Sequence, residues 1–512
     1  MRKYLGLTLL VTCVTAWFSY AYFNIDEYFQ VIEPARFVLG QVDRWTLPWE
    51  FADRIRPWMQ PLAYATLGRA LGAVGVHDPF SLGFAFRLVT GLLCVGALAL
   101  YLRTTLPWAK DPDERRAHLR VATLLGFFPY LFVRTSSETL SMAAATAAFA
   151  LLLGGARSVS PRTWELPSLT RPGVLLSSGF LLGLAFEARF QTAFLAIALL
   201  TWLGVVGRAR VAQLAIVLAS GGLAVALGVL VDRVGYGEWT LTPWRYFRGN
   251  VIEGIAGQFG TDPPFAYLWI LPANAFFPIV VALLVVCAVA WFRFPWHPST
   301  WATLPFFVVH NLIPHKEERF LFPIAILATG LVPLAVRAWP LLLRASRGAV
   351  GKALAGVNFA LMGLLAFYPL GWHHHVRFQR FVHEHVGDEL SAFALPGFEL
   401  GLPAYHPRVY DVEKAEPSVV AERIDAGVAR PWLVVDAPQL PPELSGRATL
   451  VWSELPTYRD AEVTARILRL VDAYNAVARA PLRRLEYRSL YAITVAAPPS
   501  KTTPAPEGTR LP

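Results

Sequence analysis

Charged residues stand in several short segments that border long apolar stretches, and two of these segments have the residue types for catalysis. The first, N-I-D-E-Y-F-Q, spans Asn24 to Gln30 and contains the adjacent carboxylates Asp26 and Glu27. Carboxylates at a membrane edge are costly to desolvate, so their presence needs a reason. A partly buried Asp26 could serve as general base for an acceptor hydroxyl. The alternative is a capped interfacial helix, with Asn24 or Asp26 as N-cap and Glu27 favouring the helix dipole.

The second segment is H-K-E-E-R-F, residues 315–320, between two apolar stretches with almost no loop. Lys316 and Arg319 could clamp a phosphate, Arg in bidentate fashion and Lys as a point charge. Glu317 and Glu318 could orient these cations or bind sugar hydroxyls. The alternative is a turn in which the ion pairs neutralise one another.

Two further turns and one long loop hold additional candidates. Arg134 in R-T-S-S-E and Arg189 in E-A-R-F-Q could line the same polar region, and snorkelling side chains are the alternative for both. The loop 232–265 interleaves aromatic and polar residues, which suits either sugar stacking or an interfacial aromatic belt. The candidates in this loop are Asp232, Tyr236 and Asn250.

Other patterns argue against metal, nucleotide and nucleic-acid chemistry. The run His373-His374-His375 indicates a wet juxtamembrane segment, because adjacent histidines rarely face one ion together. The D-x-D at Asp111 lies among Lys and Arg and is interpreted as a solvated charge run. Walker A and G-x-G-x-x-G motifs are absent from the sequence. The net charge of +10 is spread over many short loops, so no nucleic-acid partner is predicted. From the motifs above, no metal or cofactor is predicted either.

A membrane-embedded helical frame is expected to position these segments. Of the 512 residues, 55% are hydrophobic and 16% charged, whereas a soluble domain has about 25% charged residues. Since a membrane span needs about 20 apolar residues, we predict an all-α polytopic domain over residues 1–372. The first span is interpreted as uncleaved rather than as a signal peptide, because its apolar stretch is long. The eleven expected spans cover roughly 5–23, 82–102, 121–133, 138–154, 173–186, 190–206, 211–231, 266–292, 298–313, 320–336 and 353–371.

Lys and Arg gather in alternate loops, and the positive-inside rule then places the N-terminus in the cytoplasm. The outer loops 24–81 and 232–265 and the charged turns fall on the non-cytoplasmic side. Residues 25–39 can form an amphipathic helix in the interface. An odd number of spans places a small soluble α/β domain, 373–496, on that side too, followed by a disordered tail, 497–512. Its predicted strands are 431–436, 449–452 and 487–495, and its predicted helices are 418–426 and 461–480.

With these motifs in order, the sequence resembles the multispanning mannosyltransferases of the GPI-anchor and N-glycan pathways, glycosyltransferase family 22 with a GT-C fold. Asp26-Glu27-Tyr28-Phe29-Gln30 is similar to the family's D-E-x-x-Q. The segment Trp49-Glu50-Phe51, followed by Arg54-Ile55-Arg56, resembles T-W-E-aromatic with R-I-R, although Pro48 replaces the Thr. The stretch from Tyr236 to Asn250 resembles Y-G-x-W with T-P-x-x-[FY]-x-x-x-N. His315 to Phe320, with Pro323, resembles the signature H-K-E-E-R-F…P.

The resemblance implies a polyprenyl-phosphate sugar donor, with mannose as the sugar, and transfer with inversion to a lipid-linked glycan or other acceptor. Asp26 would be the base, with Glu27 beside it. The donor phosphate and sugar would be bound by His315, Lys316, Glu317, Glu318, Arg319, Arg134 and Arg189. The acceptor and loop residues would be Gln30, Trp49, Glu50, Arg56, Asp232, Tyr236 and Asn250.

Short loops indicate a bacterial relative, hence an inner-membrane enzyme with its site and C-terminal domain in the periplasm. Two other functions are compatible with such a chain. One is a transporter or flippase of lipid-linked sugars, although transporters typically carry charge near the midplane and here it lies in the turns. The other is a scaffold subunit that binds partners through its C-terminal domain.

Overall fold

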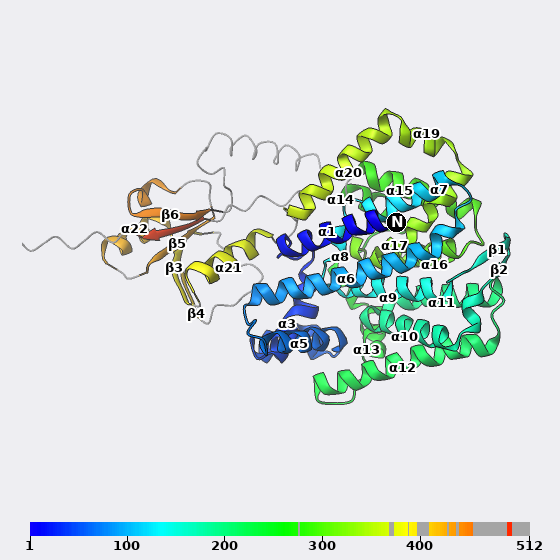
Figure 1. Ribbon diagram of the computed structural model, residues 1–512. Helices are drawn as coiled ribbons and strands as arrows, with labels where there is room; N and C mark the ends of the chain where they lie inside the picture. Colours follow the sequence, from blue (N-terminus) through cyan, green and yellow to red (C-terminus); the bar gives the residue numbers. More distant parts are fainter. Residues whose placement is uncertain are drawn as a thin grey trace, which may run out of the picture. The chain divides into compact units, whose positions relative to one another are not determined.

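The computed structural model describes residues 1–274, 277–367, 373–387, 389–396, 409–427, 430–436, 440–453 and 489–493. They belong to two compact units, Met1–His373 and His374–Pro512. The first unit is mainly helical in its described part (Figure 1), and its strands there are the two of the short hairpin β1 (Arg157–Ser160) and β2 (Thr163–Glu165).

The long and medium helices of the first unit follow the apolar segments of the sequence. Their bounds are α1 Arg2–Phe18, α5 Met59–Gly72, α6 Pro79–Thr105, α7 Pro112–Leu124, α9 Ser137–Leu152, α10 Pro172–Ala188, α11 Ala193–Val205, α12 Val211–Tyr236, α14 Tyr267–Asn274, α15 Phe277–Arg293, α16 Pro298–Leu312 and α20 Ala349–Phe367. Short helical elements connect them. These are α2 Ile25–Glu27, η1 Tyr28–Ile32, α3 Glu33–Val38, η2 Arg44–Thr46, α4 Trp49–Ala52, η3 Leu106–Trp108, α8 Phe128–Phe132, η4 Pro167–Thr170, η5 Phe190–Thr192, α13 Thr242–Phe247, η6 Arg248–Ile252, η7 Ile255–Phe259, η8 Glu318–Ile324, α17 Ala325–Ala328, η9 Thr329–Leu331, α18 Val332–Ala338 and α19 Leu341–Arg347.

Each of the eleven predicted spans is mostly helical in its described part. Among the described residues, four helical stretches are long and apolar enough to cross a membrane: Pro79–Trp108, Val211–Tyr236, Glu318–Ala338 and Ala349–Phe367. Helices α15 and α16 together form one further stretch, bent by 116°. Helices α9, α10 and η5–α11 are apolar but shorter. Membrane-type helices are therefore present, while the number of eleven spans stays a prediction.

Helix starts are fixed by side-chain caps. Asp111, the first residue of the D-x-D, accepts hydrogen bonds from the backbone N–H groups of Asp113 and Glu114, each at 2.8 Å, and so begins α7. Ser136 caps α9 through the N–H of Thr139, at 3.3 Å. Such caps satisfy N–H groups that have no partner inside the helix. The D-x-D is thus a helix cap.

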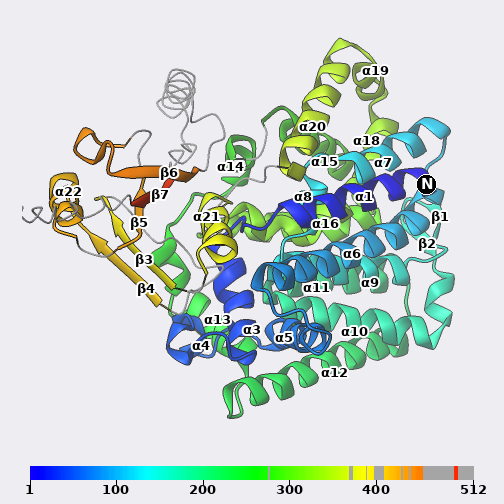
Figure 2. The ribbon, with the colours of Figure 1, turned by 60° about the vertical axis from the view of Figure 1, so that its left-hand side comes forward.

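The helices of the first unit pack as a row (Figure 2). Helix α1 contacts α6, α6 contacts α9, α9 contacts α10, and α10 contacts α12. The last contact depends on small residues: a Cβ at Gly179 would overlap the carbonyl oxygen of Val217, and one at Gly183 would overlap that of Gly221. Gly179 and Gly183 are spaced as G-x-x-x-G, a pattern that lets two helix backbones approach closely.

The two predicted outer loops contain more helix than expected. Residues 25–38 are continuously helical through α2, η1 and α3, which confirms the helix predicted there. Helix α12 continues to Tyr236 and ends at Gly237, whose φ of 79° suits glycine. Asp232 and Tyr236 therefore lie in the last turns of a helix, so the predicted outer loop 232–265 is helical at its start.

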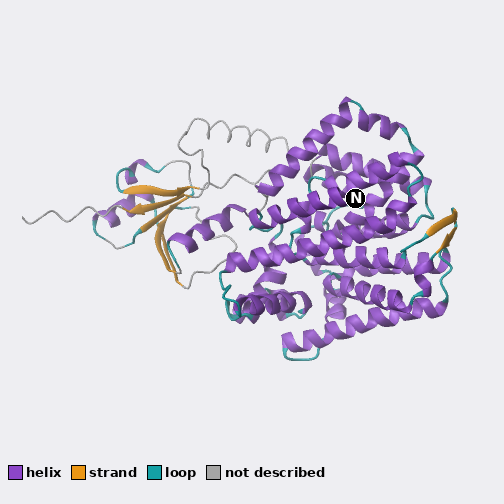
Figure 3. Cartoon of the chain, in the orientation of Figure 1, coloured by secondary structure: helices purple, strands orange, loops and turns teal. Residues whose placement is uncertain are grey.

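The second unit contains a mixed sheet covered on both faces (Figure 3). Its strands are β3 Glu389–Ala394, β4 Val409–Lys414, β5 Trp432–Val435, β6 Ala448–Ser453 and β7 Ser489–Ile493, in the order β4-β3-β5-β7-β6. Strand β3 is parallel to β4 and β5, and β7 is antiparallel to β5 and β6. Phe393, Leu433 and Val435 face α22 (Pro417–Asp425), whereas Leu390 and Val434 face α21 (His373–His385).

The strands predicted at 431–436 and 449–452 and the helix at 418–426 match β5, β6 and α22. The strand predicted at 487–495 matches β7 over its described residues. The sequence missed β3 and β4. The predicted helix 461–480 and the tail 497–512 lie outside the described residues, and the placement of this unit outside the membrane stays a prediction.

Candidate active site

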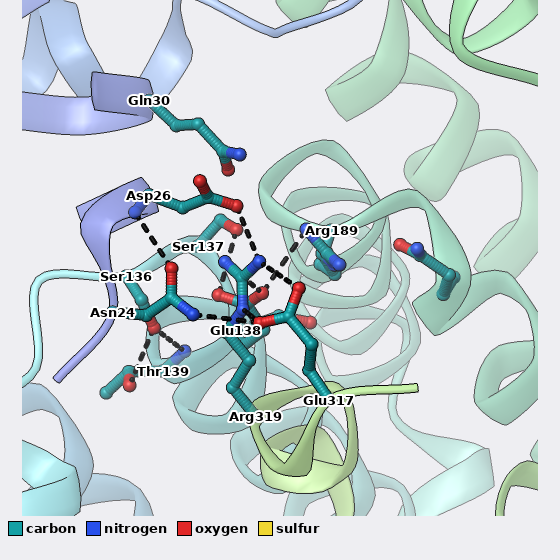
Figure 4. A network of polar contacts seen from close by, with 12 residues as sticks. Asn24, Asp26, Gln30, Ser136, Ser137, Glu138, Thr139, Arg189, Glu317 and Arg319 are labelled. Atoms are coloured by element: carbon teal, nitrogen blue, oxygen red, sulfur yellow. Dashed lines mark hydrogen bonds and ion pairs between the residues drawn. The ribbon is translucent and has the colours of Figure 1, made fainter. Parts of the chain in front are cut away.

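Asp26 lies in the first helical turn after α1. The side chain of Asn24 accepts a hydrogen bond from the backbone N–H of Asp26 at 2.9 Å, so Asn24 is the N-cap that the sequence left open. The Asp26 carboxylate points instead towards Arg319 (Figure 4). Its Oδ2 accepts a hydrogen bond from Nη2 of Arg319 at 2.5 Å, and the side chain keeps 24% exposure. A carboxylate in such a position is accessible to a hydroxyl group and is held in place by a fixed cation.

Arg319, the second residue of η8, joins Asp26 to the H-K-E-E-R-F turn. Its Nε and Nη2 donate to the two carboxylate oxygens of Glu317, both at 2.7 Å. Nδ2 of Asn24 donates to the same carboxylate at 2.8 Å. Arg319 is only 4% exposed. The structure therefore brings the first predicted motif and the H-K-E-E-R-F motif into one network, although they lie 293 residues apart.

A third carboxylate, Glu138 of α9, completes this network and was not singled out from the sequence. Its Oε1 lies 3.2 Å from Nη1 of Arg189 and 3.4 Å from Nη1 of Arg319. Both guanidinium groups also lie over the ring of Phe320, with their Cζ atoms 4.8 and 5.3 Å from its centroid. An ionisable residue at the start of the apolar run S-E-T-L-S-M-A-A-A was the available signal.

His315 contacts the network from the turn itself. Its Nε2 lies 3.2 Å from Oε1 of Glu317, and this hydrogen bond raises the pKa of His315 above its usual value. Burial acts to raise the pKa of Glu317, but the hydrogen bonds from His315 and Arg319 outweigh it and hold that pKa well below the usual range. Both shifts favour the ion pair of a Glu317 carboxylate with a protonated His315. Glu318, which begins η8, is half-buried.

Lys316 is buried and directed towards the backbone. Its Nζ donates to the carbonyl oxygens of Ile313, at 2.7 Å, and Asp262, at 3.1 Å. Burial lowers the pKa of Lys316. On the same side, Nδ1 of His315 lies 3.1 Å from the carbonyl oxygen of Gly260. Lys316 therefore holds the loop after η7 against the turn, and its hydrogen bonds to described residues go to backbone carbonyl oxygens, which does not match the phosphate clamp predicted for it.

Glu27 and Arg134 are also directed away from the network. Glu27 is 2% exposed and accepts hydrogen bonds from the N–H groups of Phe23, at 2.9 Å, and Thr135, at 3.2 Å. Burial raises its pKa, and Arg134 opposes this shift. Arg134 is 1% exposed and donates to the carbonyl oxygens of Ala21, at 2.7 Å, and of Tyr130, at 3.2 Å, and also bonds Ser19. Both residues join the end of α1 to the segment before α9.

A second polar cluster adjoins the first, formed by the predicted acceptor residues. Nη2 of Arg56 donates to Oε1 of Glu50 at 2.6 Å, and Nε2 of Gln30 donates to the same oxygen at 3.2 Å. The Arg56 guanidinium lies 5.6 Å from the ring centroid of Tyr246, whose hydroxyl accepts from Gln191 at 2.6 Å. Gln30, Glu50 and Arg56 are thus brought together.

Of the remaining predicted loop residues, one is exposed at the surface and three hold the backbone of neighbouring segments. Trp49 is 42% exposed and stacks on Phe259, at 6.3 Å and an interplanar angle of 13°. Asp232, fully buried, accepts from the N–H of Trp58 at 2.7 Å. Tyr236 donates to the carbonyl oxygen of Arg56 at 2.5 Å, and Asn250 donates to that of Tyr246 at 3.1 Å. The last three fix the loops around the cluster.

Groups of three or more His, Cys, Asp or Glu that could hold a metal ion are not found among the residues that the structure describes. The polar network is built from carboxylates paired with arginines, so it offers acceptors for hydroxyl groups and guanidinium donors for an anion. Its chemistry would be proton transfer at Asp26 and charge stabilisation by Arg189 and Arg319.

Comparison with known proteins gives the class of this chain. A family model of enzymes that transfer mannose matches residues 4–393, which defines a glycosyltransferase class. The chain belongs to the Alg9-like mannosyltransferase family. This confirms the resemblance predicted from the D-E-x-x-Q and H-K-E-E-R-F motifs.

Individual relatives are distant. GPI alpha-1,2-mannosyltransferase 3 of Mus musculus is 25% identical over 311 residues, which cover 58% of this chain and 52% of the relative. GPI mannosyltransferase 3 of Yarrowia lipolytica is 25% identical over 344 residues, covering 63% and 61%. The chain thus spans between half and two thirds of these curated relatives. Among solved structures, apo ArnT from Cupriavidus metallidurans is similar with a TM-score of 0.48 and 12% identity, covering 96% of this chain and 99% of ArnT.

Proposed function

We propose that this chain transfers mannose from a polyprenyl-phosphate donor to a lipid-linked glycan or other acceptor, with inversion, on the non-cytoplasmic face of a membrane. The observation that carries the proposal is the hydrogen bond between Arg319 and Asp26, at 2.5 Å. It joins a carboxylate suited to take a proton with cations suited to a phosphate. The family membership supports mannose as the sugar.

In the proposed step, the acceptor oxygen attacks the anomeric carbon from the side opposite the phosphate. Its proton passes to Asp26, and we assign it to Oδ1, since Oδ2 is held by Arg319. The new carbon–oxygen bond forms while the bond from the anomeric carbon to the phosphate oxygen breaks. Polyprenyl phosphate leaves with the electron pair. Preorganised cations at the leaving oxygen contribute the electrostatic stabilisation that often dominates such reactions.

We assign this electrostatic role to Arg189 and Arg319. Both are deeply buried, both lie over Phe320, and their Nη1 atoms converge on Glu138. Lys316 is assigned to holding the loop, because its Nζ already donates to backbone carbonyls. Gln30, Glu50 and Arg56 form the adjoining cluster that we assign to acceptor recognition.

The orientation is supported by the charges of the loops. The network is built at the ends of α1, α10 and α16, next to turns that carry few cations, whereas Lys and Arg gather in alternate loops such as 103–120. The positive-inside rule places those basic loops in the cytoplasm. The lipid chain of the donor would lie beside the helices, with its phosphate at the network.

The test is mannose transfer by the purified full chain from polyprenyl-phosphate mannose to octyl α-mannoside. We expect the wild type to form product and D26N to lose at least about 10²-fold in rate, the usual size of general-base catalysis. The matched control is D53N, which changes an exposed aspartate of the same outer loop. Digestion of the product with anomer-specific mannosidases shows whether the configuration at the anomeric carbon has been inverted.

Full activity in D26N would remove Asp26 as base. Movement of the lipid-linked sugar across vesicles without any product would instead identify a flippase and contradict the proposed transfer.

A further inference from the structure

Glu138 places a fully buried negative charge where two arginines converge. The side chain has 0% exposure, and those of Arg189 and Arg319 have 5% each. The three residues come from α9, from the segment after α10 and from η8. Two guanidinium groups in one buried site repel each other, and a single carboxylate between them offsets that repulsion.

The contacts of Glu138 with the arginines are electrostatic without good hydrogen-bond geometry. Among the described residues, Nη1 of Arg189, Nη1 of Arg319 and Oε1 of Glu138 are all buried and form no hydrogen bond, although the ion-pair distances are 3.2 and 3.4 Å. Buried N–H groups without a hydrogen bond are rare and need an explanation. Two such donors on neighbouring arginines are suited to a phosphate oxygen.

The network as a whole carries no surplus positive charge. Direct contacts join three carboxylates, Asp26, Glu138 and Glu317, to the two guanidinium groups of Arg189 and Arg319. The imidazole of His315 is the remaining titratable member. An anion entering this site therefore meets as much negative as positive charge when His315 is protonated, and more negative than positive charge when His315 is neutral. The cost of a second negative charge on the ligand is accordingly high.

Donor and product of the proposed reaction differ in this charge. A polyprenyl-phosphate sugar is a phosphodiester with one negative charge, whereas the released polyprenyl phosphate is a monoester with about −1.5 to −2 at neutral pH. On the basis of the proposed function, we propose that Glu138 is a specificity-determining residue. Its charge makes the arginine pair prefer a singly charged phosphodiester and so favours release of the doubly charged product.

Direct binding of two matched lipids tests this inference. The probes are farnesyl phosphate, doubly charged at pH 8, and farnesyl methyl phosphate, singly charged. Titration calorimetry of the full chain in detergent gives the ratio of the two Kd values. In E138Q, one negative charge is removed at nearly constant shape, and we expect the ratio to shift about tenfold towards the monoester. E138D, which keeps the charge, should retain the wild-type preference.

The matched control is E114Q. Glu114 is also a buried carboxylate paired with an arginine, Arg337 at 2.6 Å, but it belongs to α7. E114Q should leave the ratio unchanged even if it lowers thermal stability. An E138Q protein with the wild-type ratio would overturn the inference. If E138Q does not fold, R189Q tests the same dependence on charge in the opposite direction. Loss of a positive charge should weaken binding of the monoester more than binding of the diester.

The binding ratio does not depend on turnover, so the two proposals fail separately. A charge-dependent ratio in a chain that transfers no mannose supports the role of Glu138 and contradicts the transfer. Transfer with an unchanged ratio in both E138Q and R189Q contradicts only the role of Glu138.

Discussion

At the scale of single residues, His315 should make the stability of the protein depend on pH. The hydrogen bond with Glu317 raises the pKa of His315 above its ordinary value of about 6.5. A raised pKa means that protonated His315 stabilises the folded state; the contribution is complete below about pH 6.5 and is lost as pH rises through the raised value. We expect the Tm in detergent to fall by about a few degrees over this window and H315Q to lack that fall. H77Q, at an exposed histidine, is the control. An equal slope in H315Q would contradict the prediction.

The same scale shows what the sequence could and could not predict about the site. Asp26, Glu317 and Arg319 meet as expected from their motifs, yet Glu27, the immediate neighbour of Asp26, is turned into the protein. Successive residues of a helix point about 100° apart, so two adjacent carboxylates cannot face one site. The sequence identified which residue types the site contains, but the direction in which each side chain points depends on how α1, α9 and η8 pack.

At the scale of elements, Lys316 should control the loop after η7. Its hydrogen bonds to Ile313 and Asp262 hold this loop against the turn, together with the bond from the N–H of Asp262 to the carbonyl of Pro314, at 2.8 Å. In K316M the carbonyls lose their donor, and we expect amide hydrogen exchange in residues 255–263 to accelerate about tenfold or more. The control R248M removes an exposed arginine that pairs with Glu253. Unchanged exchange in K316M would show that the loop is held by other contacts.

Element boundaries in this region illustrate why the sequence was only partly informative. Hydropathy ended the span near Val231, because Asp232 and Arg233 are charged, whereas the helix continues to Tyr236. The charge of Asp232 is tolerated in the helix because it accepts the N–H of Trp58 from a distant loop. Such a partner, 174 residues away, cannot be deduced from local composition.

At the scale of the whole molecule, the contact between α10 and α12 should limit stability. A methyl group at Gly183 would overlap the carbonyl oxygen of Gly221 and the side chain of Ala224. We expect G183A to destabilise the chain by about 1–3 kcal/mol, the usual cost of overpacking. G222A is the matched control in α12, since a Cβ there meets nothing within 4 Å. Thermal unfolding of both variants in the same detergent measures the difference, and an equal Tm would show that the contact accommodates the methyl group without loss of stability.

The closure of the carboxylate–arginine network also bears on how the chain is made. Asp26 and Arg319 are separated by 293 residues, and a ribosome adds roughly 5–20 residues per second. Asp26 is thus synthesised about 15–60 s before its partner, and Glu138 also precedes both of its arginines. During that interval Asp26 has no Arg319 to pair with, whereas Glu138 gains its first partner, Arg189, before Arg319 is made. A chain that stops before η8 therefore lacks Arg319 and cannot close the carboxylate–arginine network, so the site is complete only after more than 300 residues have been made.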